Sequence, residues 1–267
     1  MEQKLFTELR PLYVTSRESP NEIRIRIRMR DLIDPIILRH AVDTTMERYP
    51  YFLVELRKKD KHYVFMENHR PVVITNSLHG VALNSADSNF HMIAFCWQDN
   101  WIILDVFHGM TDGTGAYEVL RTLLFYDGFR PDRGRECADG RGLHQGHQRL
   151  LLSKESDRER LGAAGYINAL AARVVTATVS YVGKANYKAA EQYIRDFRMW
   201  TSSAADGLTV EIFAVNGRFT LDFLQTFPSP LFVNAFLKEL EENGIVYDPQ
   251  DVNELELPNI ELPWTEQ

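Results

Sequence analysis

The sequence has 267 residues, 45% of them hydrophobic and 25% charged, with a formal net charge of −7. This composition is typical of a folded globular protein, and the acidic excess leaves no basic surface for a nucleic-acid backbone. Residues 1–10 mix both charge signs with single apolar residues, so they lack the apolar core of a secretory signal. The chain has two cysteines, Cys137 and Cys96, and Cys96 lies in an apolar strand-like run where a buried thiol is expected. The chain is therefore expected in the reducing cytoplasm, without disulfides or a membrane span.

The first predicted elements are a strand and a helix. Residues 22–30, EIRIRIRMR, alternate apolar and cationic side chains with a period of two, which predicts a strand with its apolar face on a core. The cationic side chains of Arg24, Arg26 and Arg28 then lie on the opposite face, which is expected to be exposed to water. Asp34-Pro35 is a helix-start signal, so a helix is expected from there to the RYPYF break.

Four more strands and a second helix are predicted to follow. Residues 51–60 and 61–68 form two strands joined by a charged turn, and residues 90–107 form a hairpin that turns at residues 98–100. After a glycine-rich turn, apolar residues at helical spacing predict a helix at 114–126. These strands are expected to lie in a sheet, in a mixed α/β lobe.

The second half of the chain opens with an irregular segment. Residues 128–160 are dense in Gly, Arg and Asp and show no sustained period. They are predicted to form a linker between an N-terminal lobe at residues 1–127 and a C-terminal lobe at residues 161–267.

A strand, a short helix, a hairpin and a final helix are predicted beyond the linker. In that order they lie at residues 172–183, 188–197, 208–227 and 229–244. The hairpin turns on Asn216-Gly217, the strongest short turn signal in the chain. Ser229 is the expected N-cap of the final helix, Pro230 lies in its first turn, and Gly244 is its stop signal.

His108 has the character of a general base. It stands where an apolar strand meets a glycine-rich turn, so the sheet holds the ring while its edge faces a cleft. An unperturbed histidine side chain, with a pKa of about 6.5, can accept a proton at neutral pH. Asp112 can fix the turn or cap the next helix, and Gly113 and Gly115 allow unusual backbone conformations. The plain alternative is a partly buried structural histidine before an ordinary strand-to-helix turn.

The segment DVFHGMTDGTGAYEVLRTLL resembles the H-x-x-x-D-G active-site segment of the chloramphenicol-acetyltransferase-like superfamily. This superfamily includes nonribosomal peptide condensation domains and alcohol acetyltransferases. Further similarity to the alcohol acetyltransferase-like branch lies at residues 34–52, 181–197 and 232–245. The resemblance implies an α/β (α+β) lobe in which helices flank a mixed sheet.

The resemblance also implies a role for each motif residue. His108 would be the general base that takes a proton from an alcohol or amine as this acceptor attacks an acyl thioester. Asp112 would be a structural carboxylate paired with an arginine, and Gly113 would let the loop turn. The candidates for that arginine are Arg24, Arg26, Arg28 and Arg57.

The same resemblance implies the partners. The cosubstrate would be acyl-CoA or an acyl-phosphopantetheine on a carrier protein, with no permanently bound cofactor and no metal. The acceptor would be a small alcohol or amine.

The sequence departs from the family in two places. Phe107 stands where condensation domains have a second histidine. Between residues 127 and 173 no counterpart is found for the segments that open the family's second lobe, so the C-terminal lobe is expected to be incomplete. Such shortening would expose apolar surface beside His108. The isolated chain is therefore expected either to self-associate or to be only marginally stable. The shortening also keeps open the alternative of a noncatalytic family member that acts as a binding or interaction protein.

Two weaker patterns complete the sequence. His144 and His147 have a spacing used in metal sites, which would suit a metal-dependent hydrolase, but no third ligand is nearby. Arg195, Arg198 and Trp200 could meet a phosphate, although a solvated helix end beside a core aromatic is the simpler interpretation.

Overall fold

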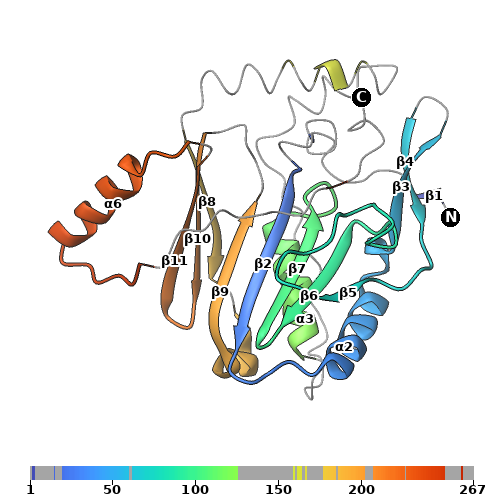
Figure 1. The fold of residues 1–267 in the computed structure, drawn as a ribbon, viewed down its shortest axis with the longest axis horizontal. Coiled ribbons are helices and arrows are strands. Elements are labelled where there is room, and N and C mark those ends of the chain that lie inside the picture. Colours follow the sequence, from blue (N-terminus) through green and yellow to red (C-terminus); the bar gives the residue numbers. More distant parts are fainter. Residues whose placement is uncertain are drawn as a thin grey trace.

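The computed structural model describes an α/β protein whose sheets and helices are shown in Figure 1. The predicted fold class, a mixed sheet with flanking helices, is confirmed. The described residues are 2–3, 15, 20–59, 62–125, 159, 161–163, 166, 177–184, 186–201, 207–225, 227–249 and 260.

The elements of the first half alternate between strands and helices. In chain order they are β1 (Glu2–Gln3), β2 (Glu22–Met29), α2 (Pro35–Arg48), a 3₁₀ helix (Pro50–Phe52), β3 (Val54–Lys59), β4 (His62–Glu67), β5 (Ile74–Asn76), β6 (Ile93–Gln98), β7 (Trp101–Phe107) and α3 (Gly113–Phe125).

The second half supplies four strands and the α-helix α6 among its described residues, and residues 159, 161–163 and 166 are also helical. In chain order the elements are β8 (Thr178–Lys184), a 3₁₀ helix (Lys188–Tyr193), β9 (Ile194–Thr201), β10 (Leu208–Val215), β11 (Arg218–Gln225) and α6 (Leu231–Glu242). The predicted linker at 128–160 lies outside the described residues except for Glu159, and so does the start of the strand predicted at 172–183.

The central sheet has the strand order β5-β6-β7-β2-β9. β2 pairs antiparallel with both β7 and β9, while β5 runs parallel to β6, so the sheet is mixed. The other described strands form two three-stranded sheets, in the orders β1-β4-β3 and β11-β10-β8. Because β9 belongs to the second half of the chain, the central sheet joins the two halves through β2.

Local signals set several element boundaries as predicted. The Asp34 carboxylate accepts the backbone N–H groups of Ile36 at 2.8 Å and Ile37 at 3.3 Å, which caps α2. The β6–β7 hairpin turns within the predicted residues, with Asp99 at φ +53°. The β10–β11 hairpin turns on Asn216 and Gly217, at φ +52° and +73°. Two successive positive φ angles are what a tight type I′ hairpin turn requires.

Two expectations about the second half are wrong. The helix predicted at 188–197 is a 3₁₀ helix that ends at Tyr193, because the next residues pair with β2 as strand β9. Tertiary pairing overrides helix propensity here. Ser229 does not cap α6, whose N-cap is Pro230 without a side-chain hydrogen bond.

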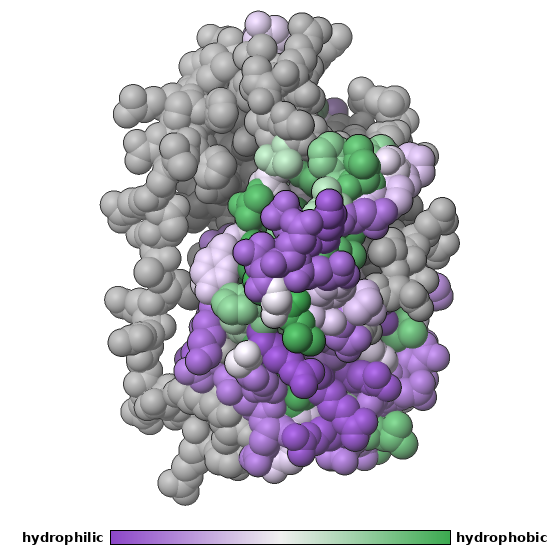
Figure 2. Space-filling view, turned by 90° about the vertical axis from the view of Figure 1, so that its left-hand side faces the viewer, coloured by the Kyte–Doolittle hydropathy of each residue, from purple (hydrophilic) through white to green (hydrophobic). Residues whose placement is uncertain are grey.

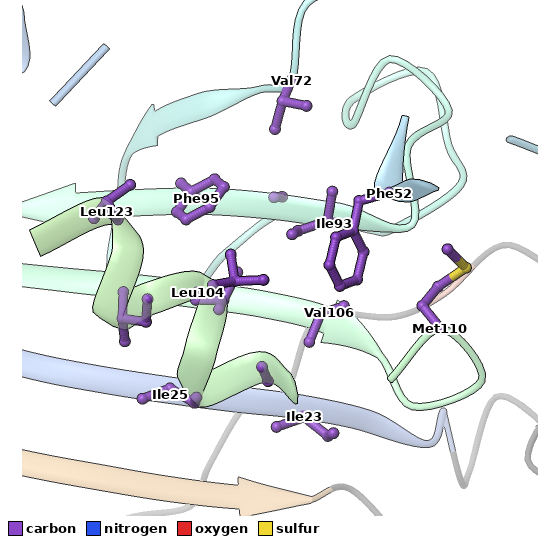
Figure 3. Packing of buried hydrophobic residues seen from close by; sticks show 14 of the residues in the cluster. Ile23, Ile25, Phe52, Val72, Ile93, Phe95, Leu104, Val106, Met110 and Leu123 are labelled. Atoms are coloured by element: carbon purple, nitrogen blue, oxygen red, sulfur yellow. The ribbon is translucent and has the colours of Figure 1, made fainter. Parts of the chain in front are cut away.

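The hydrophobic core lies between the central sheet and α3. Figure 3 shows Ile23 and Ile25 of β2, Leu104 and Val106 of β7, and Ile93 and Phe95 of β6 facing the side on which α3 packs. Every one of these side chains is at most 1% exposed. Burial of this many large apolar side chains supplies the main driving force for folding.

The α6 side of the molecule is less well packed. Figure 2 shows mainly hydrophilic residues over the described part of this face, with hydrophobic residues grouped toward one end. None of the residues of α6 is buried, and Leu231 and Phe232 are exposed. α6 contacts the sheet next to it through aromatic rings, with the Phe223 and Phe236 centroids 5.3 Å apart.

The opposite face of β2 is polar but not solvated near its start. Arg24 is only 2% exposed, and its Nε and Nη2 donate to the Asp105 carboxylate of β7 at 2.5 and 2.8 Å. Nη2 also donates to the His79 carbonyl oxygen at 2.8 Å. The prediction that this face lies in water is therefore wrong for Arg24, whereas Arg28 at the far end of the strand is exposed.

Burial dominates the electrostatics of this polar face. It raises the pKa of the Asp105 carboxyl, and the Arg24 guanidinium opposes that rise. It also raises the pKa of Glu22, further helped by the charge of Asp105. Cys96, a buried free thiol as expected, has its pKa raised by burial to about 12. Removing one partner of the Arg24–Asp105 pair would therefore leave the other charge uncompensated in this buried face.

Breaking the Arg24–Asp105 pair on one side should destabilise the protein strongly. Arg24→Met leaves a buried carboxylate without its guanidinium, so the free energy of unfolding should fall by about 3–5 kcal/mol in urea titrations. The double variant Arg24→Met/Asp105→Leu should lose less than Arg24→Met alone. The control is Lys238→Met, which breaks a pair whose side chains are 72% and 56% exposed. An exposed pair of this kind should change stability by about 0–1 kcal/mol.

Candidate functional site

His108 directly follows β7, at the end of the central sheet where the neighbouring strand β2 begins. Its backbone N–H donates to the Asn21 carbonyl oxygen at 2.8 Å, just before β2 begins. The turn after it is closed by the Met110 N–H on the Phe107 carbonyl at 2.9 Å. The His108 side chain is half-buried. Its Nδ1 is fully buried and has no hydrogen-bond partner among the described residues.

Asp112 caps α3. Its Oδ1 accepts the Gly115 N–H at 2.8 Å, and its carbonyl accepts the Ala116 N–H at 3.0 Å. Capping this helix is one of the two roles that the sequence suggested for Asp112. The carboxylate is exposed, so it is held by backbone donors of the helix start, where a negative charge is favoured.

The four arginines proposed as partners of Asp112 make other contacts in the described part of the chain. Arg24 pairs with Asp105, and the Arg57 Nε lies 2.7 Å from the Glu55 carboxylate. Arg26 and Arg28 lie over the Trp101 ring, at 4.9 and 5.6 Å from its centroid. Asp112 therefore stabilises the turn by capping α3. No described cationic side chain forms an ion pair with it.

The glycines of the motif allow neighbouring atoms to come closer to the backbone than a side chain would permit. None of Gly109, Gly113 and Gly115 has a positive φ, so the expected backbone freedom is not what selects them. A Cβ on Gly113 would come within 2.7 Å of Met199 Cε in β9 and 3.5 Å of Val182 Cγ1 in β8. A Cβ on Gly115 would collide with the Thr111 hydroxyl. Gly113 therefore lets the start of α3 rest against strands from the second half of the chain.

Glu211 of β10 is a buried acid that the sequence analysis did not single out. It is 3% exposed, and its Oε1 accepts a hydrogen bond from the Thr201 hydroxyl at 3.1 Å. Burial raises its pKa, while hydrogen bonds from Ser180 and Thr201 and the charge of His108 lower it. The sequence does contain a signal for this residue, because Glu211 is the one charged residue in the otherwise mostly apolar strand LTVEIFAV.

The arginines considered as a phosphate site are engaged elsewhere or lie apart. Arg198 approaches the Asp196 and Asp222 carboxylates, at 3.3 Å in each case. Trp200 is buried, and Arg195 is exposed on the same strand. These residues lie on β9 rather than at a helix end, and Arg198 is neutralised by its two acids.

The described residues offer no site for a metal ion, since no group of three or more His, Cys, Asp or Glu side chains converges among them. His144 and His147 lie outside the described residues. Within the described ranges, no helix combines the length and the hydrophobicity needed to cross a membrane.

Comparison with known proteins identifies the fold. No protein-family model and no curated protein match the sequence. Among solved structures, the polyketide synthase associated protein 5 from Mycobacterium tuberculosis matches with a TM-score of 0.56 and 8% identity, over 93% of this chain and 98% of that chain. A variant of the starter condensation domain of the rhizomide synthetase RzmA, in complex with C8-CoA, has a TM-score of 0.57 and 8% identity, over 91% and 94% of the two chains. The wax ester synthase/diacylglycerol acyltransferase from Marinobacter aquaeolei VT8 has a TM-score of 0.50 and 12% identity, over 87% and 97%.

The chain thus has the fold of condensation domains and of acyltransferases such as the wax ester synthase. This agrees with the resemblance to the chloramphenicol-acetyltransferase-like superfamily, which rested on the motif around His108 and on residues 34–52, 181–197 and 232–245. At these identities the likeness concerns the fold, and the chemistry has to be argued from the site.

Adding side-chain volume at Gly113 should separate α3 from β9. Gly113→Ala should be tolerated, because the nearest atom is the flexible end of Met199. Gly113→Val is overpacked and should lower the free energy of unfolding by about 1–3 kcal/mol in urea titrations.

A double-mutant cycle with Met199→Ala tests the contact. The double variant should cost less than the sum of the two single variants, because the shortened side chain makes room for valine. Strict additivity would show that Gly113 and Met199 do not limit the approach of α3.

Proposed function

We propose that this protein is an acyltransferase that moves an acyl group from a thioester to an alcohol or amine, with His108 as the general base. The observation that carries the proposal is the position of His108. Its backbone is fixed between β7 and β2, and its ring is half-buried and close enough to Glu211 of β10 for the two charges to interact. A base for acyl transfer needs a fixed ring and a partly enclosed space for two substrates.

The reaction follows from the ordinary chemistry of thioesters. His108 takes the proton of the acceptor hydroxyl or amine through Nε2, while the acceptor oxygen or nitrogen attacks the thioester carbonyl carbon. A new ester or amide bond forms as the carbon–sulfur bond breaks. The imidazolium then returns the proton to the thiolate, which leaves as a free thiol.

Two properties of the site support this assignment. Nδ1 of His108 is buried without a described partner, and we assign the contact with the acceptor to the other ring nitrogen, Nε2. Asp112 and the close-packed Gly113 fix the start of α3 directly after the His108 turn, so the loop that carries the base is held at both ends.

The donor is proposed to be acyl-CoA or an acyl-phosphopantetheine on a carrier protein, as a cosubstrate rather than a resident cofactor. Support comes from the fold neighbours, one of which is a condensation domain in complex with C8-CoA and another a wax ester synthase/diacylglycerol acyltransferase. Small alcohols or amines are the proposed acceptors.

Removal of His108 should abolish most of the activity. The purified chain is incubated with acetyl-CoA or octanoyl-CoA and a panel of alcohols and amines, and released thiol is followed together with the ester or amide product. His108→Ala should lower kcat/KM by about 10²–10⁴-fold, the usual contribution of a general base.

The matched control is His40→Ala on the exposed side of α2, which should leave the rate unchanged. If His108→Ala keeps the wild-type rate, the base assignment is wrong. If neither CoA donors nor carrier-bound donors are consumed by the wild type, the noncatalytic alternative replaces acyl transfer.

A further inference from the structure

Strand pairing brings Glu211 to the same end of the sheet as His108. Thr201, the last residue of β9, pairs with Ile23 of β2. Two residues before Ile23, the Asn21 carbonyl accepts the His108 N–H at 2.8 Å. Thr201 in turn donates its hydroxyl to Glu211 at 3.1 Å. Glu211 is therefore linked through Thr201 to one edge of β2 near its start. His108 is linked to the other edge, at the residue just before β2.

The two side chains also belong to the same face of the sheet. Thr201 and Met199 are two residues apart on β9, so they point to the same side. Met199 is the side chain that approaches Gly113, at the start of α3. Val182, which also approaches Gly113, follows Ser180 by two residues on β8, and Ser180 pairs with Glu211. Met199 and Val182 thus connect this face of β8 and β9 with the start of α3, which follows the turn of His108.

Each of the two groups has one buried atom without a described partner. They are Nδ1 of His108 and Oε2 of Glu211. Leaving a buried polar atom unpaired costs about 1–3 kcal/mol, so such atoms normally bond one another or a shared water. Asp112 does not compete for the ring, because its exposed carboxylate already accepts the Gly115 N–H.

We propose that Glu211 is the positioning residue of the catalytic base: its Oε2 accepts the Nδ1–H of His108 through one bridging water. This proposal rests on the proposed function of His108. The contact fixes the tautomer in which Nε2 is free to take a proton, and it holds the ring toward the acceptor. It also stabilises the imidazolium that forms during the reaction, since the Glu211 carboxylate lies in a site with little solvent.

The base and its positioning residue come from different halves of the chain. His108 comes from the first half, and its partner comes from β10 in the second half. The Thr201 hydroxyl holds Oε1 of Glu211, so the other oxygen is left for the ring. The second half thereby contributes to the chemistry as well as to the enclosure of the site.

Replacement of Glu211 should lower kcat and leave the donor KM nearly unchanged. Glu211→Met keeps the length of the side chain but removes the acceptor, and should lower kcat by about 10- to 100-fold. Glu211→Gln keeps an oxygen and loses the charge, so it should fall between Glu211→Met and the wild type. The matched control is Asp222→Asn, a carboxyl-to-amide change on the residue that pairs with Glu211 across the β10–β11 ladder, and it should keep the wild-type kcat.

The His108 tautomer is measured independently by nitrogen NMR on histidine-labelled protein, with the signal assigned through His108→Ala. In the wild type, neutral His108 should carry its proton on Nδ1, and in Glu211→Met it should shift toward the Nε2–H form that free imidazole side chains prefer. If Glu211→Met does not fold, Thr201→Val should show the same changes at smaller size, because it removes the hydrogen bond that orients Glu211.

The two proposals fail in different ways. A wild-type kcat and an unchanged tautomer in Glu211→Met, with His108→Ala inactive, would overturn the role of Glu211 and leave acyl transfer standing. If the wild type transfers no acyl group, the proposed function fails, and the tautomer measurement alone decides whether Glu211 holds the ring.

Discussion

The arrangement of this protein depends on strand β2, which is paired on both edges. β7 lies on one side of it and β9 on the other, so the strand links the first half of the chain to the second. The Arg24–Asp105 ion pair fixes β2 to β7 from within a buried polar face. Burying such a pair carries a desolvation cost, and the loss of either partner would leave an uncompensated charge between the two strands. The position of His108 follows, because its N–H is bonded to the residue directly before β2.

The candidate site is assembled from segments that are distant in sequence. The base stands on the turn after β7, the cap of α3 fixes that turn, and the buried acid Glu211 arrives on β10. Strands β8 and β9 approach the start of α3 closely because Gly113 carries no Cβ. Precise placement of a reacting group requires such rigid supports, since a small displacement lowers the rate considerably. The site therefore belongs to the contact between the two halves rather than to either half alone.

The fold is shared with proteins that are only 8–12% identical in sequence. A fold tolerates such divergence because it depends on the period of apolar residues and on turn chemistry, which many sequences satisfy. The chemistry of a site depends on a few side chains in a fixed arrangement. For that reason His108 and Glu211 carry more weight for the function than the extent of the structural match does.

The sequence by itself determined the features that depend on residues a few positions apart. It predicted the Asp34 cap, the turn at Asn216-Gly217, the β6–β7 hairpin and the helix after His108, because each is set by local backbone preferences and neighbouring hydrogen bonds. It also marked His108 through the spacing of its motif.

Only the tertiary structure decided which charged groups are buried and which segments pair. Arg24 is shielded by a carboxylate 81 residues away, and residues 194–201 are a strand because β2 lies beside them. Glu211 gains its position near His108 through the Thr201 contact and the packing of β10. An alternating pattern shows that a strand has two faces, but the segments that cover each face come from elsewhere in the chain. The environment of a charged side chain therefore depends on the assembled sheet and cannot be predicted from a local sequence pattern.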